Sequence, residues 1–411
     1  MKIIKILATI LLVLAVIAGL NWSKIERLIH VKSLFDADKI VYNFSHMNEV
    51  LYSSELPRSG EEHQWKVELK PLPETYVDRE LTKNTMVMLE ELQTTGLVIV
   101  KEGVIQYENY FKGTSQTDKR ISWSMSKSFV SALTGLALQR GEIKDINDPV
   151  TQYVSSLKGS AYDGVPLLDV LNMASGIKFD ENYLDPGSDI NKMGTVLALG
   201  GSLDEFAAEQ KNINRPSGTK WQYCSIDTHV VSMVLRAATG KTLQEYFIEN
   251  IWSKIGASAD AYYSTDGDGN AFALGGLNMS TRDYALFGEL YLNHGKRGDT
   301  QIIPASWVDA STVNSAPQGD VKATTKTQDG KRFGYGYQWW MPPQADSEYF
   351  AVGVYGQYIY INPKAGIVIA KNAAHREFMQ SDEKGESYMM QNITLFRQLA
   401  EHYSDWRFAN N

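Results

Sequence analysis

The spacing of apolar residues predicts strands near both ends of the main part of the chain and helices in its middle. Residues 96–108 form two apolar runs joined at Glu102-Gly103, which is typical of a β-hairpin. From about residue 140 to about residue 260 the pattern is mostly helical, with turn residues between the helices. Strand patterns return in the last third of the chain, at residues 334–341, 349–354, 357–361 and 366–372. Two further helices are expected at residues 281–292 and 387–403.

These elements predict one sheet built from both ends of the chain, with a helical region inserted between its two parts. We expect the mixed α/β region to comprise residues 85–145 and 260–405, and the helical region to comprise residues 146–259. Residues 24–84 are polar and broken by Pro and Gly, so they predict an N-terminal extension that wraps the body. A chain of 411 residues has room for two or three domains or for one composite body.

Residues 1–23 differ in kind from the rest of the chain. Two lysines among the first five residues precede an uncharged apolar run over residues 6–20. This pattern fits a signal peptide, and it also fits a short membrane anchor extended by Trp22 at the interface. Both interpretations predict export to the periplasm or the cell exterior, and an anchor would tether the protein to a membrane through residues 6–23.

Composition and charge argue against several classes of function. The formal net charge is -8 and no run of Lys and Arg is present, so nucleic acid is not an expected partner. The single cysteine, Cys224, allows neither an internal disulfide nor a zinc site of paired cysteines, and the seven histidines include no His-x-x-x-His pair. Residues 266–270 resemble half of a calcium loop, but Ala271 and Leu277 stand where glycine and glutamate are needed, so we expect a surface turn. No metal or cofactor is therefore expected, and the expected partner is a small-molecule substrate.

Ser124 and Lys127 stand three residues apart at the start of an apolar run with helical spacing. On one face of a helix the Lys127 amine would reach the Ser124 hydroxyl and activate it as a nucleophile, provided that burial or a neighbouring cation lowers the pKa of Lys127. The free N–H groups at the helix start would favour an oxyanion that develops at Ser124. By itself the pair is also compatible with a serine N-cap and a solvated lysine.

Further motifs follow this pair in order along the chain. They are Asp145-Ile-Asn-Asp-Pro-Val150, Leu171-Asn-Met-Ala-Ser-Gly176 and Tyr223-Cys-Ser225. Together with Ser124-Met-Ser-Lys127, they resemble the β-lactamase-related serine hydrolases, which include class C β-lactamases, penicillin-binding DD-peptidases, family VIII esterases and 6-aminohexanoate-dimer hydrolases. The resemblance spans roughly residues 85–405. It implies a β-lactamase/DD-peptidase-like α+β fold, in which an antiparallel sheet is flanked by helices and carries an inserted all-helical region.

The resemblance also implies that Ser124 is the nucleophile and that Lys127 and Tyr223 relay its proton. A tyrosine suits this role, because a phenolate held near two ammonium-like charges can accept the serine proton and later pass it to the leaving group. Ser225 would extend the hydrogen-bond network toward the substrate.

The third motif departs from that of the lactamases, in which a Lys-Thr-Gly strand lines the site. Here the segment Phe350-Ala-Val-Gly-Val-Tyr-Gly-Gln357 lacks Lys and His. Gly353 would keep the edge strand open to substrate, and Tyr355 is a candidate substrate contact. The backbone N–H groups of Ser124 and Val354 would form an oxyanion hole. Without a cation to bind a substrate carboxylate, β-lactams and D-Ala-D-Ala peptides become poorer candidates.

The variant third motif and residues 179–186 are more similar to the 6-aminohexanoate-dimer hydrolase and family VIII esterase branch. In that branch a loop tyrosine contacts the scissile amide, and Tyr183 is the matching candidate here, although loop tyrosines also serve in packing. We therefore expect a serine hydrolase that acts through an acyl-enzyme on an ester or a small linear amide. Two alternatives stay open: a β-lactamase or DD-carboxypeptidase with an altered third motif, and a non-catalytic exported binding protein on the same fold.

Overall fold

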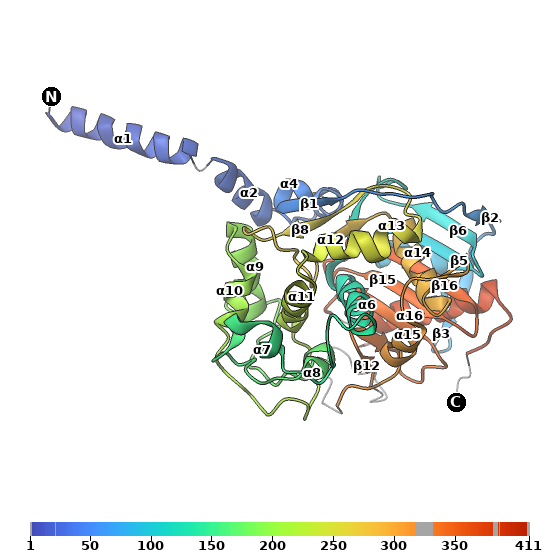
Figure 1. Ribbon diagram of the computed structural model, residues 1–411. Coiled ribbons are helices and arrows are strands. Elements are labelled where there is room, and N and C mark those ends of the chain that lie inside the picture. Colours follow the sequence, from blue (N-terminus) through green and yellow to red (C-terminus); the bar gives the residue numbers. More distant parts are fainter. Residues whose placement is uncertain (1, 21, 318–331, 381–384, 386, 409–411) are drawn as a thin grey trace.

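The computed structural model describes residues 2–20, 22–317, 332–380, 385 and 387–408, and its body is built around an eight-stranded sheet (Figure 1). The strand order is β12-β13-β14-β15-β16-β5-β6-β2, and all neighbouring strands are antiparallel except β2 and β6. The strands are β12 (Gly334–Gly336), β13 (Trp339–Met341), β14 (Tyr349–Gly353), β15 (Gln357–Asn362), β16 (Ile367–Ala373), β5 (Thr94–Lys101), β6 (Val104–Tyr110) and β2 (Lys66–Val67). The predicted antiparallel sheet, assembled from both ends of the chain, is confirmed.

Strands β5 and β6 form the hairpin that the sequence predicts, and β5 lies in the core. Its residues from Leu97 to Val100 are fully buried, and β16 pairs with its other edge. The turn residues Glu102 and Gly103 have φ angles of 49° and 79°. Positive φ at both central residues is typical of the type I′ turn, whose twist matches that of the flanking strands.

The prediction of a single strand at residues 334–341 is wrong, because the structure divides this segment into β12 and β13. Tyr337 and Gln338 turn the chain with φ angles of 40° and 72°. The buried Gln338 side chain fixes the turn: its Nε2 donates to the Leu171 carbonyl at 2.7 Å, and its Oε1 accepts from Thr228 Oγ1 at 2.8 Å. These partners are distant in sequence, so the local pattern of apolar residues could not reveal the turn.

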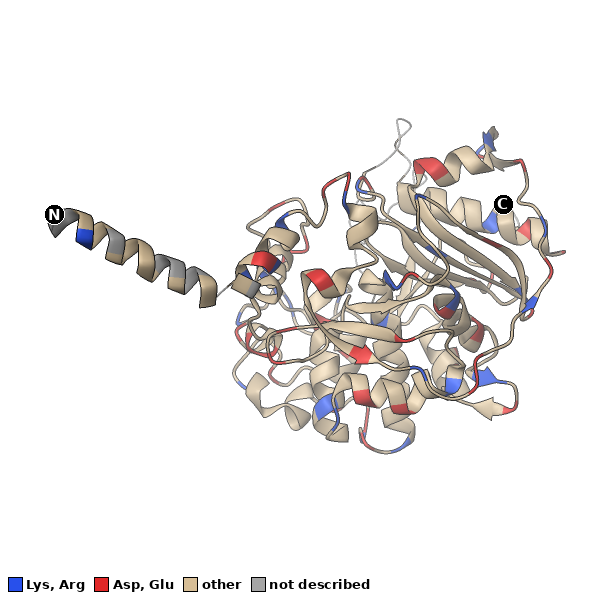
Figure 2. Cartoon of the chain, turned by 90° about the horizontal axis from the view of Figure 1, so that it is seen from above, with Lys and Arg blue, Asp and Glu red and all other residues tan. Residues whose placement is uncertain are grey.

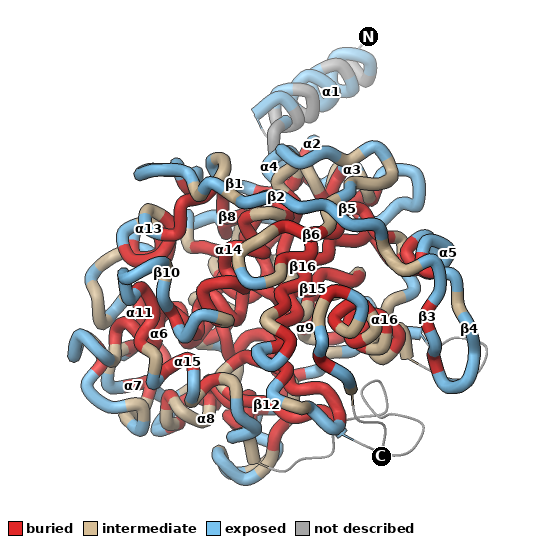
Figure 3. The backbone as a smooth tube through the Cα atoms, turned by 90° about the vertical axis from the view of Figure 1, so that its right-hand side faces the viewer, coloured by how far each residue is buried: buried red, intermediate tan, exposed pale blue. Residues whose placement is uncertain are grey.

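Helices cover both faces of the large sheet, and Figure 3 shows buried residues concentrated in the sheet and the adjoining helices. On one face, α14 (Thr281–Leu292) approaches so closely at Gly288 that an added Cβ would stand 2.9 Å from Ile359 Cγ2. On the other face, Phe396 of α16 (Tyr388–Tyr403) packs against the Tyr358 ring at 5.3 Å. Successive strand residues point to opposite faces, so β15 contacts both helices. Both helices were predicted from the sequence and are confirmed.

Between residues 33 and 93 the chain forms short elements, and its short strands pair with the body. Strand β1 (Tyr52–Leu56) pairs with β8 (Ala261–Thr265) in a second sheet of order β1-β8-β9-β7. Strand β2 extends the large sheet beside β6. The other two strands of the second sheet are β9 (Leu277–Met279) and β7 (Arg120–Ile121). The N-terminal part of the chain also contains α2 (Trp22–Lys32), α3 (Ile40–Asn43), α4 (Met47–Val50), β3 (Thr75–Asp78), β4 (Leu81–Asn84) and α5 (Thr85–Glu91).

The chain between β7 and β8 is mostly helical. Its central helix, α11 (Ser225–Thr239), is buried from Ser225 to Leu235 and lies against α6 (Ser126–Gln139). The other helices of this part are α7 (Val150–Tyr153), a 3-10 turn (Ser155–Leu157), α8 (Leu167–Leu171), α9 (Asp189–Leu199), α10 (Leu203–Ala208), α12 (Leu243–Phe247), a π-helical turn (Ile248–Trp252) and α13 (Ser253–Ile255). After β9 the chain also forms α15 (Ala305–Ser311).

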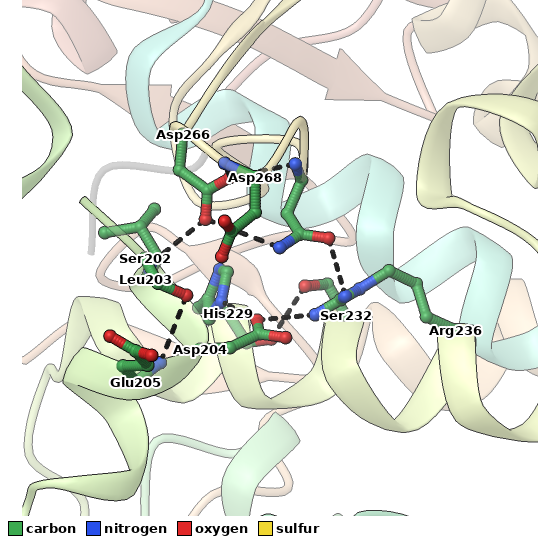
Figure 4. A network of polar contacts seen from close by, with 10 residues as sticks. Ser202, Leu203, Asp204, Glu205, His229, Ser232, Arg236, Asp266 and Asp268 are labelled. Carbon is green, nitrogen blue, oxygen red and sulfur yellow. Dashed lines mark hydrogen bonds and ion pairs between the residues drawn. The ribbon is translucent and has the colours of Figure 1, made fainter. Parts of the chain in front are cut away.

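The calcium-like segment is a surface turn, as expected, because residues 267–269 are exposed, but Asp266 at its start is 1 % exposed and belongs to a polar network (Figure 4). Its carboxylate accepts hydrogen bonds from the N–H groups of Leu203 at 3.0 Å and Asn270 at 2.9 Å. Asn270 Oδ1 in turn accepts from Arg236, whose guanidinium also binds Asp204 at 2.6 Å. The network joins α10, α11 and the loop after β8, so its carboxylates serve the fold.

The first helix, α1 (Lys2–Leu20), projects away from the body (Figures 1 and 2). Figure 2 also shows that basic and acidic residues are scattered over many elements of the body. Within the described ranges, none of the helices combines the length and the apolar character needed to cross a membrane.

Candidate active site

Ser124 lies in a tight turn that is held between strand β7 and helix α6. A 3-10 turn, η1 (Trp123–Met125), follows β7, and α6 begins at Ser126. Trp123 has a φ of 44°, in the left-handed region that costs a non-glycine residue about 1–3 kcal/mol. Its ring packs against those of Phe44 and Tyr355, with centroids 5.6 and 5.8 Å away. Packing therefore stabilises the strained turn that presents Ser124 just before the helix.

The alternative in which a serine caps this helix is wrong. Neither Ser122, the N-cap of η1, nor Met125, the N-cap of α6, makes a side-chain capping hydrogen bond. Ser126 instead donates its hydroxyl to the Ala273 carbonyl at 2.7 Å. Ser124 contacts Lys127, so these serines have different partners.

Lys127 is buried beside Ser124 and is not the solvated lysine of that alternative. It is 2 % exposed, and its Nζ lies 2.9 Å from Ser124 Oγ and 2.9 Å from the Leu274 carbonyl oxygen. Burial lowers the pKa of Lys127 to about 7, although the nearby Glu181 and Cys224 favour the charged form. A large share of Lys127 is therefore neutral near pH 7 and able to accept the Ser124 proton.

Tyr223 completes the group predicted from the sequence, in a different electrostatic setting from the one expected. Its ring lies 5.4 Å from Lys127 Nζ, and its hydroxyl is hydrogen-bonded to Ser124 and Ser225. We expected two ammonium-like charges near the phenol, but burial and the carboxylate of Glu181 both raise the pKa of Tyr223. Tyr223 is consequently a protonated phenol at neutral pH, and Lys127 is the more basic partner of the serine.

Glu181 is the site residue that sequence reasoning missed. Its carboxylate accepts hydrogen bonds from the Ser225 N–H and, at 3.2 Å, from Ser225 Oγ. Tyr183, two residues further along the same loop, is hydrogen-bonded to Glu181 and Ser225, so the structure brings Tyr183 and Ser225 together beside Tyr223. A glutamate in a polar loop is usually solvated, and no local signal marked this one.

Gly353 is where β14 touches the turn that carries Ser124. A Cβ at this position would stand 2.3 Å from the Ser122 carbonyl oxygen and 3.1 Å from Ser124 N. The sequence suggested that Gly353 keeps an edge strand open. Strand β14 lies between β13 and β15, but β13 pairs with it at Phe350 and not at Gly353. The glycine permits close contact between β14 and η1, and the role of Val354 in an oxyanion hole stays a prediction.

Replacing Gly353 with alanine is expected to push β14 away from η1. The Ser122 carbonyl cannot yield without moving the backbone, so we expect a loss of about 1–3 kcal/mol in the free energy of unfolding. We also expect inactivation by a fluorophosphonate to slow at least about tenfold, because the N–H groups near Ser124 move apart. Urea unfolding and the inactivation rate constant measure the two effects.

Gly194→Ala is the matched control for Gly353→Ala. Gly194 lies in α9, and an added Cβ would meet nothing within 4 Å. Alanine should leave the fold unchanged or stabilise it by up to about 1 kcal/mol, and inactivation should match wild type. If Gly353→Ala behaves like this control, the close approach of β14 does not shape the site.

Tyr355 lies in an aromatic cluster next to the nucleophile turn. Its ring stacks on Phe35 at 5.0 Å and lies 4.6 Å from that of Phe378. Phe35 and Tyr355 also line a cavity of about 310 Å³, together with Arg376, Glu377 and Gln380. Phe35 comes from the N-terminal extension, which the sequence did not connect with the site.

Comparison with known families and proteins gives matches over most of the chain. Residues 88–391 match the model of the Beta-lactamase family. A 6-aminohexanoate-dimer hydrolase of Paenarthrobacter ureafaciens is 29% identical over 290 residues, which cover 69% of this chain and 73% of that protein. A β-lactamase of Pseudomonas fluorescens is 26% identical over 120 residues, covering 27% of this chain and 33% of that protein.

Solved structures share the fold. The proposed 6-aminohexanoate-dimer hydrolase from Bacillus anthracis superposes with a TM-score of 0.75 at 24% identity, over 90% of this chain and 95% of that chain. A family VIII carboxylesterase gives a TM-score of 0.57 at 16% identity, over 78% of this chain and 95% of that chain. At these identities the superpositions support the fold, and the chemistry has to be argued from the site.

Proposed function

Because this chain belongs to the β-lactamase family, as its motifs suggested, we propose that it hydrolyses an ester or a small linear amide through an acyl-enzyme. The observation that carries the proposal is the contact between the buried Lys127 amine and Ser124 Oγ at 2.9 Å. A neutral amine at hydrogen-bond distance is what a serine nucleophile needs as its base. The hydrolase relatives agree with this chemistry.

In the proposed reaction, Ser124 Oγ attacks the substrate carbonyl carbon while Lys127 takes the hydroxyl proton. The negative charge on the carbonyl oxygen is held by the N–H groups of Ser124 and Val354. Collapse breaks the bond to the leaving alcohol or amine, which receives a proton through the Tyr223 phenol. Water then adds to the acyl carbon, its proton returns to Ser124 Oγ, and the carboxylic acid departs.

The preference for an ester or linear amide over a β-lactam rests on the third motif. Residues 350–357 contain no lysine or histidine to bind a substrate carboxylate. Lys371 of β16 lies 3.5 Å from the Gly356 carbonyl oxygen, behind this turn. It is 1 % exposed, so protein covers its amine and it does not replace the missing cation.

A substrate panel tests this preference. We expect kcat/KM for p-nitrophenyl butyrate to exceed that for nitrocefin at least about tenfold, because a carboxylate without its cation in the third motif loses a charge-assisted contact worth about 1.5–3 kcal/mol. Comparable turnover of nitrocefin would favour the β-lactamase alternative. No turnover of any ester or amide, together with no reaction toward a fluorophosphonate, would favour the non-catalytic binding protein.

A further inference from the structure

We infer that Glu181 is a positioning residue of this site, which fixes the start of α11 against Ser124 and places a negative charge opposite the ammonium form of Lys127. The inference rests on the proposed function and adds a fourth side chain to it. Glu181 binds both the backbone N–H and the hydroxyl of Ser225, the first residue of α11.

The two hydrogen bonds explain why Tyr223 keeps its place. Cys224, the N-cap of α11, makes no side-chain capping hydrogen bond. The Glu181 carboxylate supplies that bond from a loop more than forty residues earlier, at the helix end where a negative charge is favoured. Tyr223 lies two residues before Ser225, so a carboxylate that anchors Ser225 also limits where the phenol can reach Ser124.

The charge of Glu181 is only partly compensated. Titratable groups from three parts of the chain face it, namely Lys127 of α6, Tyr223, Cys224 and Asp227 at the start of α11, and Tyr183 of its own loop. Lys127 is the cation among them, and the Glu181 charge raises the pKa of Lys127 while burial lowers it. Burial in turn raises the pKa of Glu181, and Lys127 and the Ser225 hydrogen bonds oppose that rise.

Loss of the Glu181 charge is expected to lower the pKa of Lys127. Removing the negative charge removes an attraction that stabilises the ammonium form, so the pKa of Lys127 must fall further. The neutral amine then persists to lower pH, and the acid limb of the reaction profile moves to lower pH. A charge at this range typically shifts a partly buried partner by about one pH unit.

The test is the pH dependence of fluorophosphonate inactivation, measured from pH 5 to pH 9 on the full chain. Glu181→Gln keeps an oxygen that accepts from the Ser225 N–H and loses the charge, so we expect the midpoint of the acid limb to fall by about one pH unit. Glu181→Ala loses the anchor as well, so we expect the plateau rate to fall about tenfold in addition. Asp180→Asn removes an exposed neighbouring charge and should leave the midpoint within about 0.2 units of wild type.

The outcomes separate this inference from the proposed function. A midpoint that falls in Glu181→Gln and stays in Asp180→Asn supports the inference. If Glu181→Gln lowers the plateau without moving the midpoint, or behaves as wild type in both, the inference is overturned while the proposed function stands. If wild type does not react at any pH, the proposed function itself is contradicted. Thermal unfolding of each variant shows that a slow rate reflects the site and not loss of the fold.

Discussion

Ser124→Ala is expected to lower kcat for p-nitrophenyl butyrate by about 10⁴-fold or more, which is the usual cost of removing a nucleophile from a serine hydrolase. The Lys127 amine contacts the Ser124 hydroxyl and the Leu274 carbonyl oxygen. Of these two oxygens, only the hydroxyl can attack the substrate carbonyl. Substrate binding should change little, because a single hydroxyl is deleted beside a packed turn. Steady-state kinetics, corrected for spontaneous hydrolysis of the substrate, measure the effect.

Ser126→Ala is the matched control for this prediction. Ser126 belongs to the same sequence motif, but its hydroxyl donates to the Ala273 carbonyl, whereas the Lys127 amine contacts the Ser124 hydroxyl. Its loss leaves a buried carbonyl with one partner fewer, which is expected to cost about 1–3 kcal/mol of stability and less than about tenfold in kcat. If Ser126→Ala loses as much activity as Ser124→Ala, the nucleophile has been assigned to the wrong serine.

Lys127→Arg should cost about 10³-fold in kcat at pH 7 even though it keeps the positive charge. A guanidinium stays protonated throughout the accessible pH range and cannot accept the Ser124 proton, and general-base catalysis is typically worth about 10²–10⁴-fold. In wild type the pKa of Lys127 is lowered to about 7, so the neutral amine dominates above pH 7. Activity should therefore rise about tenfold per pH unit below pH 7 and level off above it.

The pH profile of Lys127→Arg completes this prediction. The variant should show no acid limb near pH 7, because the group responsible for that limb has been removed. Equal thermal stability of the two proteins would show that the larger side chain has not opened the core. A variant that keeps most of its activity, or an acid limb that stays at the same pH, would mean that another group is the base.

Local patterns in the sequence were sufficient for much of the fold. The hairpin of β5 and β6, the late strands and the helices α14 and α16 each depend on residues within one short window. The split between β12 and β13 does not, because Gln338 is held by Leu171 and Thr228 from the helical region. A burial pattern read in one window cannot contain a partner that lies more than a hundred residues away.

The same distinction applies to the site. The spacing of Ser124 and Lys127 and the Tyr223 motif are local, and the structure brings these three side chains together. The burial that lowers the pKa of Lys127 is not local in sequence, because the Lys127 amine lies against the Leu274 carbonyl from another part of the chain. The sequence patterns did not identify Glu181 and Phe35 as site residues, because their partners in the site are also distant in sequence. Export through residues 1–23 stays a prediction, since it depends on how the chain is processed.

The role of Ser124 as a nucleophile activated by Lys127 can be tested by intact-mass spectrometry after exposure to a fluorophosphonate at pH 8. Peptide mapping then locates the adduct. We expect one phosphonyl adduct on wild type, located on Ser124, and none on Ser124→Ala under the same conditions. An unlabelled wild type, or an equal adduct on Ser124→Ala, would show that Ser124 is not the nucleophile.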